Sequence, residues 1–114
     1  MFVSVLKKVN KYRKVSERFT FANLEMVDEA PKPRKGIVTI YNGFPPDVIQ
    51  RMDITEERKS KMLDAQVQKT ILSMLLALDR RGKLKDRTPN IKALKKIDES
   101  SGREVLILFV TVRE

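Results

Sequence analysis

The sequence predicts a single α+β domain with a small, curved, mostly antiparallel sheet of about five strands and one long helix after the third strand. The chain has 114 residues, the size of one ordinary domain, so residues 1–114 are expected to form one unit. Hydrophobic residues make up 41%, which is enough for a core. One long segment has helical periodicity, whereas the other apolar segments are short and separated by Pro, Gly and Asn.

The first two strands are expected in the N-terminal quarter of the chain. Phe2–Val9 is rich in residues that favour strands, and the polar, basic segment Asn10–Ser16 is typical of a hairpin turn. Glu17–Val27 then reads as a second strand. Its apolar alternation slips by one residue at Ala22-Asn23, which indicates a β-bulge and therefore a curved strand.

A loop, a third strand and a short helical turn are expected next. Asp28–Gly36 contains two prolines and no apolar periodicity, so it is predicted to be an exposed loop. Ile37–Tyr41 is predicted to be the third strand. Because Pro45-Pro46 prevents a partner strand from starting there, Pro46–Met52 is interpreted as one helical turn.

The long helix is predicted from Thr55 to Arg81. Asp53 or Thr55 can cap its start, and Gly82 suits the left-handed position after its end. One apolar stripe runs along it, formed by Leu63, Val67, Ile71, Met74, Leu75 and Leu78.

The second half of this helix has no charged residue on any face between Thr70 and Leu78. Such a segment is expected to be covered on two sides, by its own sheet and by something else. A homodimer is the commonest such arrangement. We therefore expect a homodimer interface that contains Ile71, Leu72, Met74, Leu75 and Leu76.

The C-terminal third is expected to form a hairpin after a basic loop at Lys83–Asn90. Ile91–Ile97 and Glu104–Val112 flank a polar turn, although Ile91–Ile97 also suits a helical turn. The nearly continuous apolar run Val105–Val110 is typical of a central strand buried on both faces. This order of elements also fits an OB-like barrel, a fold that commonly binds single-stranded nucleic acid.

Positive charge is concentrated in three segments. The chain has 24 Lys and Arg against 15 Asp and Glu, a net charge of +9. Lys7–Arg18 carries +5, Pro31–Gly36 carries +3 and Arg80–Lys96 carries +7, so the rest of the chain is acidic. Clustered Lys and Arg neutralise phosphates and release counterions, which favours nucleic-acid binding over a mere role in solubility.

The predicted function is therefore non-enzymatic binding of nucleic acid, with single-stranded DNA or RNA favoured, through basic loops and a face of the sheet. Tyr12 is a candidate for stacking on an unpaired base, with a turn tyrosine that leans on the sheet as the alternative, and Tyr41 is counted among the binding residues with its role left open between stacking and core. The alternative is a protein-interaction factor, an inhibitor or adaptor that docks on an acidic partner through the long helix and the basic surface. The predicted nucleic-acid-binding residues are Lys7, Lys8, Lys11, Tyr12, Arg13, Lys14, Arg18, Lys32, Arg34, Lys35, Tyr41, Arg80, Arg81, Lys83, Lys85 and Arg87.

Several kinds of chemistry are not expected. The chain has no Cys and no His, and its four glycines are far apart, so it offers no thiol or imidazole catalysis and no Gly-rich phosphate loop. Asp47, Asp53 and Glu56 are interpreted as helix caps and dipole partners in preference to ligands of a metal nuclease. No catalytic residue, metal, cofactor, small-molecule substrate or membrane association is predicted, and the expected location is the cytoplasm.

Overall fold

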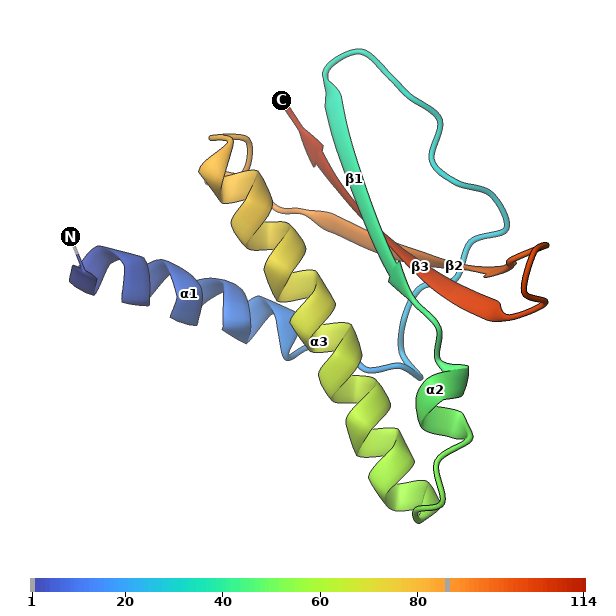
Figure 1. Cartoon of the computed structure of the whole chain (residues 1–114). Coiled ribbons are helices and arrows are strands. Elements are labelled where there is room, and N and C mark those ends of the chain that lie inside the picture. Colours follow the sequence, from blue (N-terminus) through green and yellow to red (C-terminus); the bar gives the residue numbers. More distant parts are fainter. Residues whose placement is uncertain (1, 86) are drawn as a thin grey trace.

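The structure is a computed structural model that describes residues 2–85 and 87–114. It is an α+β fold in which one long helix packs on one face of an open antiparallel sheet (Figure 1). The elements in chain order are α1 (Phe2–Ser16), β1 (Ile37–Phe44), α2 (Asp47–Gln50), α3 (Glu56–Arg80), β2 (Asn90–Ile97) and β3 (Glu104–Arg113).

The sheet has three strands in the order β1-β3-β2, so the last strand of the chain lies in the middle. β3 is antiparallel to both neighbours, which makes β1 and β2 parallel to each other, with α3 in the connection between them. A single parallel bridge from Met26 to Ala93 extends the free edge of β2. The expected sheet of about five strands and the OB-like barrel are therefore wrong.

The long helix is confirmed almost to the residue. The Thr55 hydroxyl accepts a hydrogen bond from the Arg58 backbone N–H at 3.2 Å, as a helix cap requires. Gly82, two residues beyond the last helical residue, has φ +67°, a left-handed conformation that favours glycine. The short turn α2, the strand β1 and the terminal hairpin of β2 and β3 are also confirmed, and Asn90–Ile97 is a strand.

The first predicted strand is instead the helix α1. Its inward side chains are Val9, Tyr12, Val15 and Ser16, a spacing of three to four residues that suits a helix and not a strand. The basic residues between them point to solvent. Residues at Phe2–Val9 favour a strand locally, but the segment forms a helix because α1 buries its apolar side against α3.

The second predicted strand is also wrong, since residues 17–25 form turns. Phe19 and Phe21 pack against the core, as they would from a strand, but their backbone is hydrogen-bonded by side chains of α3. The Phe21 N–H donates to Asp64 Oδ1 at 2.8 Å, and Gln68 Nε2 donates to the Phe19 carbonyl at 3.0 Å. These bonds satisfy backbone groups that would otherwise need a neighbouring strand.

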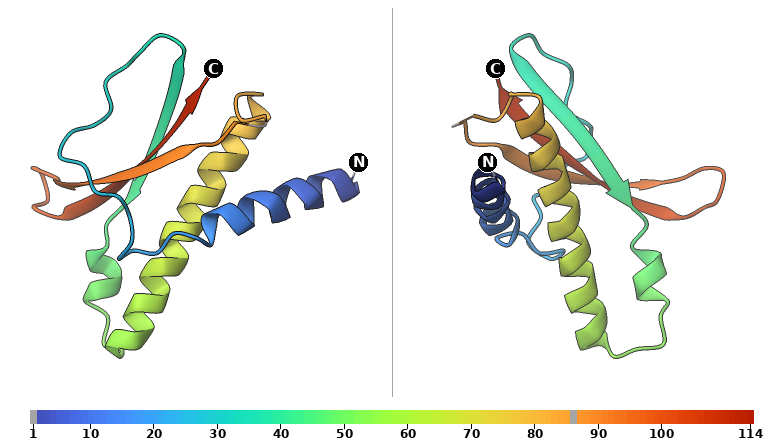
Figure 2. Two further views of the ribbon diagram at one scale, coloured as in Figure 1. Left: turned by 180° about the vertical axis from the view of Figure 1, so that it is seen from behind. Right: turned by 60° about the vertical axis from the view of Figure 1, so that its left-hand side comes forward.

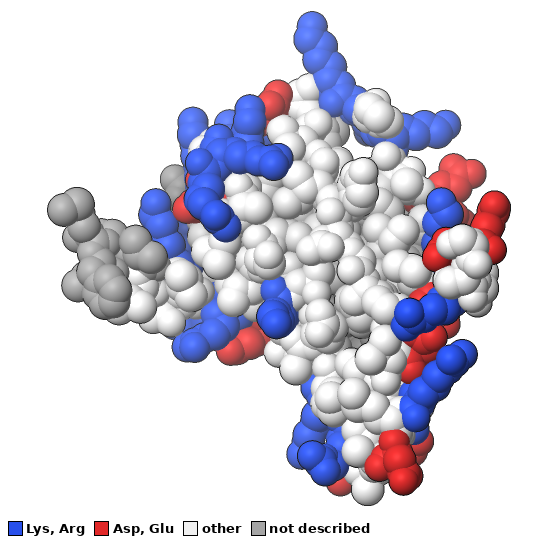
Figure 3. Space-filling model, viewed as in Figure 1, with Lys and Arg blue, Asp and Glu red and all other residues white. Residues whose placement is uncertain are grey.

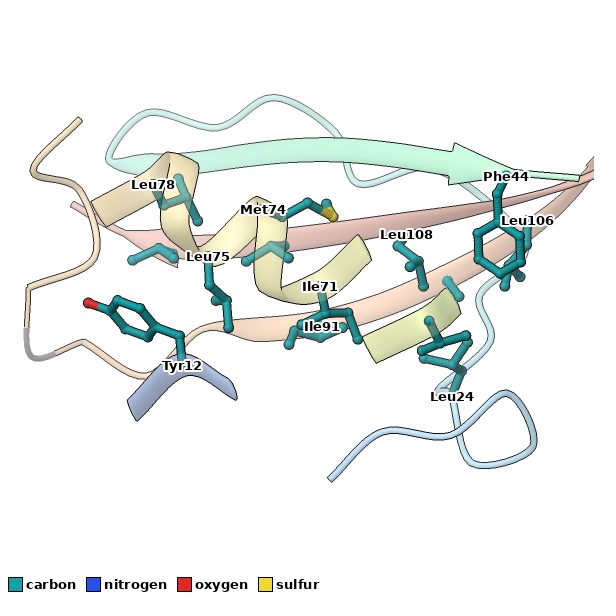
Figure 4. Packing of buried hydrophobic residues seen from close by; sticks show 14 of the residues in the cluster. Tyr12, Leu24, Phe44, Ile71, Met74, Leu75, Leu78, Ile91, Leu106 and Leu108 are labelled. Carbon is teal, nitrogen blue, oxygen red and sulfur yellow. The ribbon is translucent and has the colours of Figure 1, made fainter. Parts of the chain in front are cut away.

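The core lies between α3 and the sheet, and α1 closes it from the other side. α3 runs between α1 and β1 (Figure 2). Figure 4 shows Ile71, Met74 and Leu75 of α3 among side chains of the strands, with Tyr12 approaching from α1. The charge-free half of α3 is therefore covered within one chain.

This burial removes the reason for expecting a homodimer through α3. Ile71, Met74 and Leu75 are buried in the protomer, and Leu72 and Leu76 are partly buried against the same core. The second covering layer is α1, which the sequence interpretation had placed in the sheet. Of the described helices, none combines the length and the apolar character needed to cross a membrane.

Candidate nucleic-acid interface

The two most basic segments of the sequence meet in one groove between α1 and the loop after α3. The groove has a volume of about 320 Å³. Its floor is apolar and includes Leu75, Leu84 and Ile91. Four cationic side chains line it, namely Lys11 and Arg18 from the N-terminal segment and Lys85 and Arg87 from the loop.

A second hollow continues this groove along α1, where Lys7 and Lys14 join Lys11 and Arg18. Among residues 2–85 and 87–114, no acidic residue lines either hollow. None of these cations forms an ion pair with a carboxylate of residues 2–85 or 87–114. Cations left unneutralised beside a low-dielectric floor focus a positive potential that attracts anions. We call this surface, lined by Lys7, Lys11, Lys14, Arg18, Lys85 and Arg87, the helix groove.

Figure 3 shows the same segregation of charge on one side of the molecule. Lys and Arg predominate over the C-terminal end of α3 and beside the described part of α1, with a few acidic side chains between them, whereas the opposite end of α3 carries a closer mixture of both signs. At that opposite end, Lys59 and Lys61 pair with Glu56 and Glu57 at 3.3 and 3.4 Å.

Other predicted binding residues lie nearby but are already engaged. Lys83 donates a hydrogen bond to Glu114 Oε1 at 2.9 Å, and this bond, helped by the charges of Lys83 and Arg87, holds the pKa of Glu114 below its ordinary value. Lys8 lies 3.7 Å from Asp79, and Arg13 lies 3.6 Å from Glu17. Arg80 and Arg81 are exposed and line neither hollow.

Tyr12 is not placed for stacking, which corrects the sequence prediction. Its side chain is only 5% exposed, and its hydroxyl donates to Asp79 Oδ1 at 2.8 Å. The ring lies in the floor of the helix groove, with the ammonium of Lys11 at 5.8 Å from its centroid. Tyr12 therefore joins α1 to α3 and has no ring face on the surface for a base.

The face of the sheet away from α3 forms a second basic surface. Strand register places Thr39 opposite Thr111, and Tyr41 opposite Phe109, on this face. Asn90, Lys92, Leu94 and Lys96 of β2 lie beside them. Tyr41 is 74% exposed, and its ring centroid lies 6.5 Å from that of Phe109. We call this surface the open face.

The loop of residues 28–36 runs on the side of the sheet away from α3 and forms one wall of the open face (Figure 1). Pro31, Pro33 and Arg34 line two adjoining hollows there, of about 610 and 550 Å³. Lys32 lines the second, whereas Lys35 is exposed and lines neither. The described residues that line these two hollows include no Asp or Glu. The third basic segment and Tyr41 thus belong to a surface separate from the helix groove.

Lys92 and Lys96 are binding candidates that the sequence interpretation left out of its list of sites. Each lines a hollow of the open face, and neither forms an ion pair with a described carboxylate. The signal was the alternation of Asn90–Ile97, which places every second residue on one face of a strand. Because Ile91–Ile97 also suited a helical turn, the sequence did not decide which of its residues share a face.

The three carboxylates considered for a metal nuclease do not gather. Arg103 donates to both oxygens of Asp47, at 2.8 and 3.1 Å, and this pairing holds the pKa of Asp47 below its ordinary value. Among residues 2–85 and 87–114, no three Asp or Glu side chains are placed to hold a metal ion. The arrangement therefore offers basic surfaces for anions and no assembled carboxylate site.

Comparisons of the chain with protein-family models, with curated proteins and with solved structures find no match.

Proposed function

We propose that this protein binds nucleic acid without catalysing its cleavage, and that it acts inside the cell, where that ligand is found. The observation that carries the proposal is the helix groove, in which segments far apart in the sequence bring Lys11, Arg18, Lys85 and Arg87 together, with no Asp or Glu among the described residues that line it. These four of the six cations that line the helix groove can neutralise phosphates of a nucleic-acid backbone. Their contacts with phosphate give affinity without sequence specificity.

The alternative of an adaptor that docks through the long helix has lost its main support. The helix residues offered for docking are buried or partly buried within the protomer. An acidic polypeptide remains a useful competitor, because it carries the negative charge of a nucleic acid without its bases.

Salt dependence of oligonucleotide binding tests the proposal. Fluorescence anisotropy with labelled single-stranded DNA should show a log–log slope of about −2.8, from four phosphate contacts at roughly −0.7 each. Replacing Lys11, Arg18 and Lys85 with Gln should flatten the slope by about 2 units and weaken binding to all sequences alike.

A matched control removes the same three charges elsewhere. Arg58, Lys59 and Lys61 lie at the start of α3, where acidic residues accompany them. Changing these three to Gln should leave the slope nearly unchanged. Equal losses in both triple variants would mean that net charge alone drives binding. No binding of any oligonucleotide at low salt, with polyglutamate bound instead, would overturn the proposal in favour of an acidic protein partner.

A further inference from the structure

The open face carries a feature that phosphate binding alone does not explain. Tyr41 is the most exposed of the large apolar side chains among the described residues, at 74%. Its neighbour Phe109 is only 5% exposed, although it points to the same face. A buried aromatic therefore supports an exposed one at 6.5 Å, with the rings inclined by 55°. Tyr41 presents a ring held by a fixed contact on a rigid strand.

Polar and cationic groups surround this ring in an ordered way. On one side lies the row of Thr39, Thr111 and Asn90, in which the two threonine hydroxyl oxygens are 3.3 Å apart. Lys92 and Lys96 follow along β2. The open face thus combines an aromatic surface, hydrogen-bonding groups and cations, with no carboxylate among its described lining residues.

The helix groove and the open face meet at the start of β2. Thr88 and Pro89 line the helix groove, and the next residue, Asn90, lines the open face. A flexible strand that leaves the helix groove can therefore pass around this edge onto the sheet without meeting an acidic side chain among the described lining residues. A duplex is too stiff for such a turn, and its bases are stacked inside, away from a protein ring.

We propose that the open face binds the unpaired bases of a single-stranded nucleic acid, with Tyr41 stacking on a base and Arg34, Lys92 and Lys96 contacting phosphates. This inference rests on the proposed function, and it adds the class of ligand. Aromatic stacking accepts any base, because every base has a π face. The surface therefore distinguishes single strands from duplexes and not one sequence from another.

The first test compares Tyr41→Ala with Tyr41→Phe on labelled oligothymidylate of about twelve nucleotides and on duplex DNA of equal length. Tyr41→Ala should weaken single-strand binding about tenfold, change duplex binding less than twofold, and leave the salt slope unchanged. Tyr41→Phe keeps the ring and should bind like the parent. Because Tyr41 is exposed, circular dichroism of both variants should match the parent.

The second test uses Tyr41→Trp, which places a single tryptophan in a chain that has none. Stacking on a base should quench its fluorescence when oligothymidylate is added, at the same concentration at which anisotropy rises. Val48→Trp is the matched control, because Val48 is 51% exposed on α2 and lines neither basic surface. Its fluorescence should stay constant.

The outcomes separate this inference from the proposed function. If Tyr41→Ala binds single strands as tightly as the parent, or Tyr41→Trp is not quenched while anisotropy reports binding, the open face is not the base site and only the helix groove remains. If polyglutamate loses as much affinity as oligothymidylate in Tyr41→Ala, the open face binds acidic polypeptide instead. If the parent binds no nucleic acid, both proposals fail together.

Discussion

The two tyrosines of this chain lie among cations, yet one is buried and the other is exposed. Tyr12 stands between Lys11 and Arg13-Lys14 in the sequence and is covered by α3 and the loop after it. Tyr41 has no cation within five residues of it, yet in the structure it shares its groove with Arg34 and Lys96. Neighbours in sequence therefore predicted the exposure of neither ring.

The difference comes from the element that carries each residue. On a helix, residues adjacent in sequence diverge by about 100°, so cations flanking Tyr12 can face water while the ring faces the core. On a strand, successive side chains point to opposite faces of the sheet, and the two faces have different surroundings. Ile40 of β1 packs toward the core, and Tyr41 next to it faces the open side.

The largest expected effect is on stability. If it is not observed, the contrast between a buried Tyr12 and an exposed Tyr41 is wrong. Tyr12→Ala should lower the free energy of unfolding by about 3 kcal/mol, because it leaves a cavity and removes a buried hydrogen bond. Tyr41→Ala should lower it by less than about 1 kcal/mol, since only one face of its ring is in contact. Urea denaturation measures both values. Similar losses in the two variants would show that the rings are not buried and exposed as described.

A smaller effect is expected from Tyr12→Phe, which keeps the ring and removes only the hydrogen bond from the hydroxyl to Asp79. The expected loss is about 1.5 kcal/mol, the low end for a bond to a charged group, because the Asp79 carboxylate is partly exposed and is also approached by Lys8. A double-mutant cycle with Asp79→Asn should give a positive coupling. Oligonucleotide affinity should not change. If Tyr12→Phe keeps the fold but binds oligonucleotides tenfold more weakly than the parent, Tyr12 is part of the binding surface.

The smallest expected effect tests what the two surfaces share. Cations without partners repel one another, so Lys11→Gln with Lys85→Gln, or Lys92→Gln with Lys96→Gln, should raise the free energy of unfolding at low salt by about 0.3 kcal/mol. The gain should disappear at about 1 M salt, where the Debye length is roughly 3 Å. Lys61→Gln is the control, because Lys61 is paired with Glu57 and should give no gain. If both double variants, Lys11→Gln with Lys85→Gln and Lys92→Gln with Lys96→Gln, are less stable than the parent, these cations already have stabilising partners.

The sequence alone determined the elements whose local signals agree with one another. α3 was predictable because its apolar periodicity, the Thr55 cap and Gly82 all indicate the same helix. The continuous apolar run of β3 likewise predicted a central strand, and Ile37–Tyr41 was predicted to be a strand, whereas Ile91–Ile97 stayed open between a strand and a helical turn. The three basic segments were also evident, since charge is countable without a fold.

Only the tertiary structure decided the N-terminal quarter and the grouping of the site. Residues 2–27 are rich in Val and Phe, which suit a strand locally, but packing against α3 rewarded a helix and a set of turns whose backbone is bonded by Asp64 and Gln68. The same packing filled the face of α3 that had suggested a dimer, and it buried Tyr12. Which cations share a groove depends on the packing of segments more than sixty residues apart, since Arg18 and Lys85 line the same groove. Such contacts leave no trace in local composition, because they are chosen by the burial of apolar surface across the whole chain.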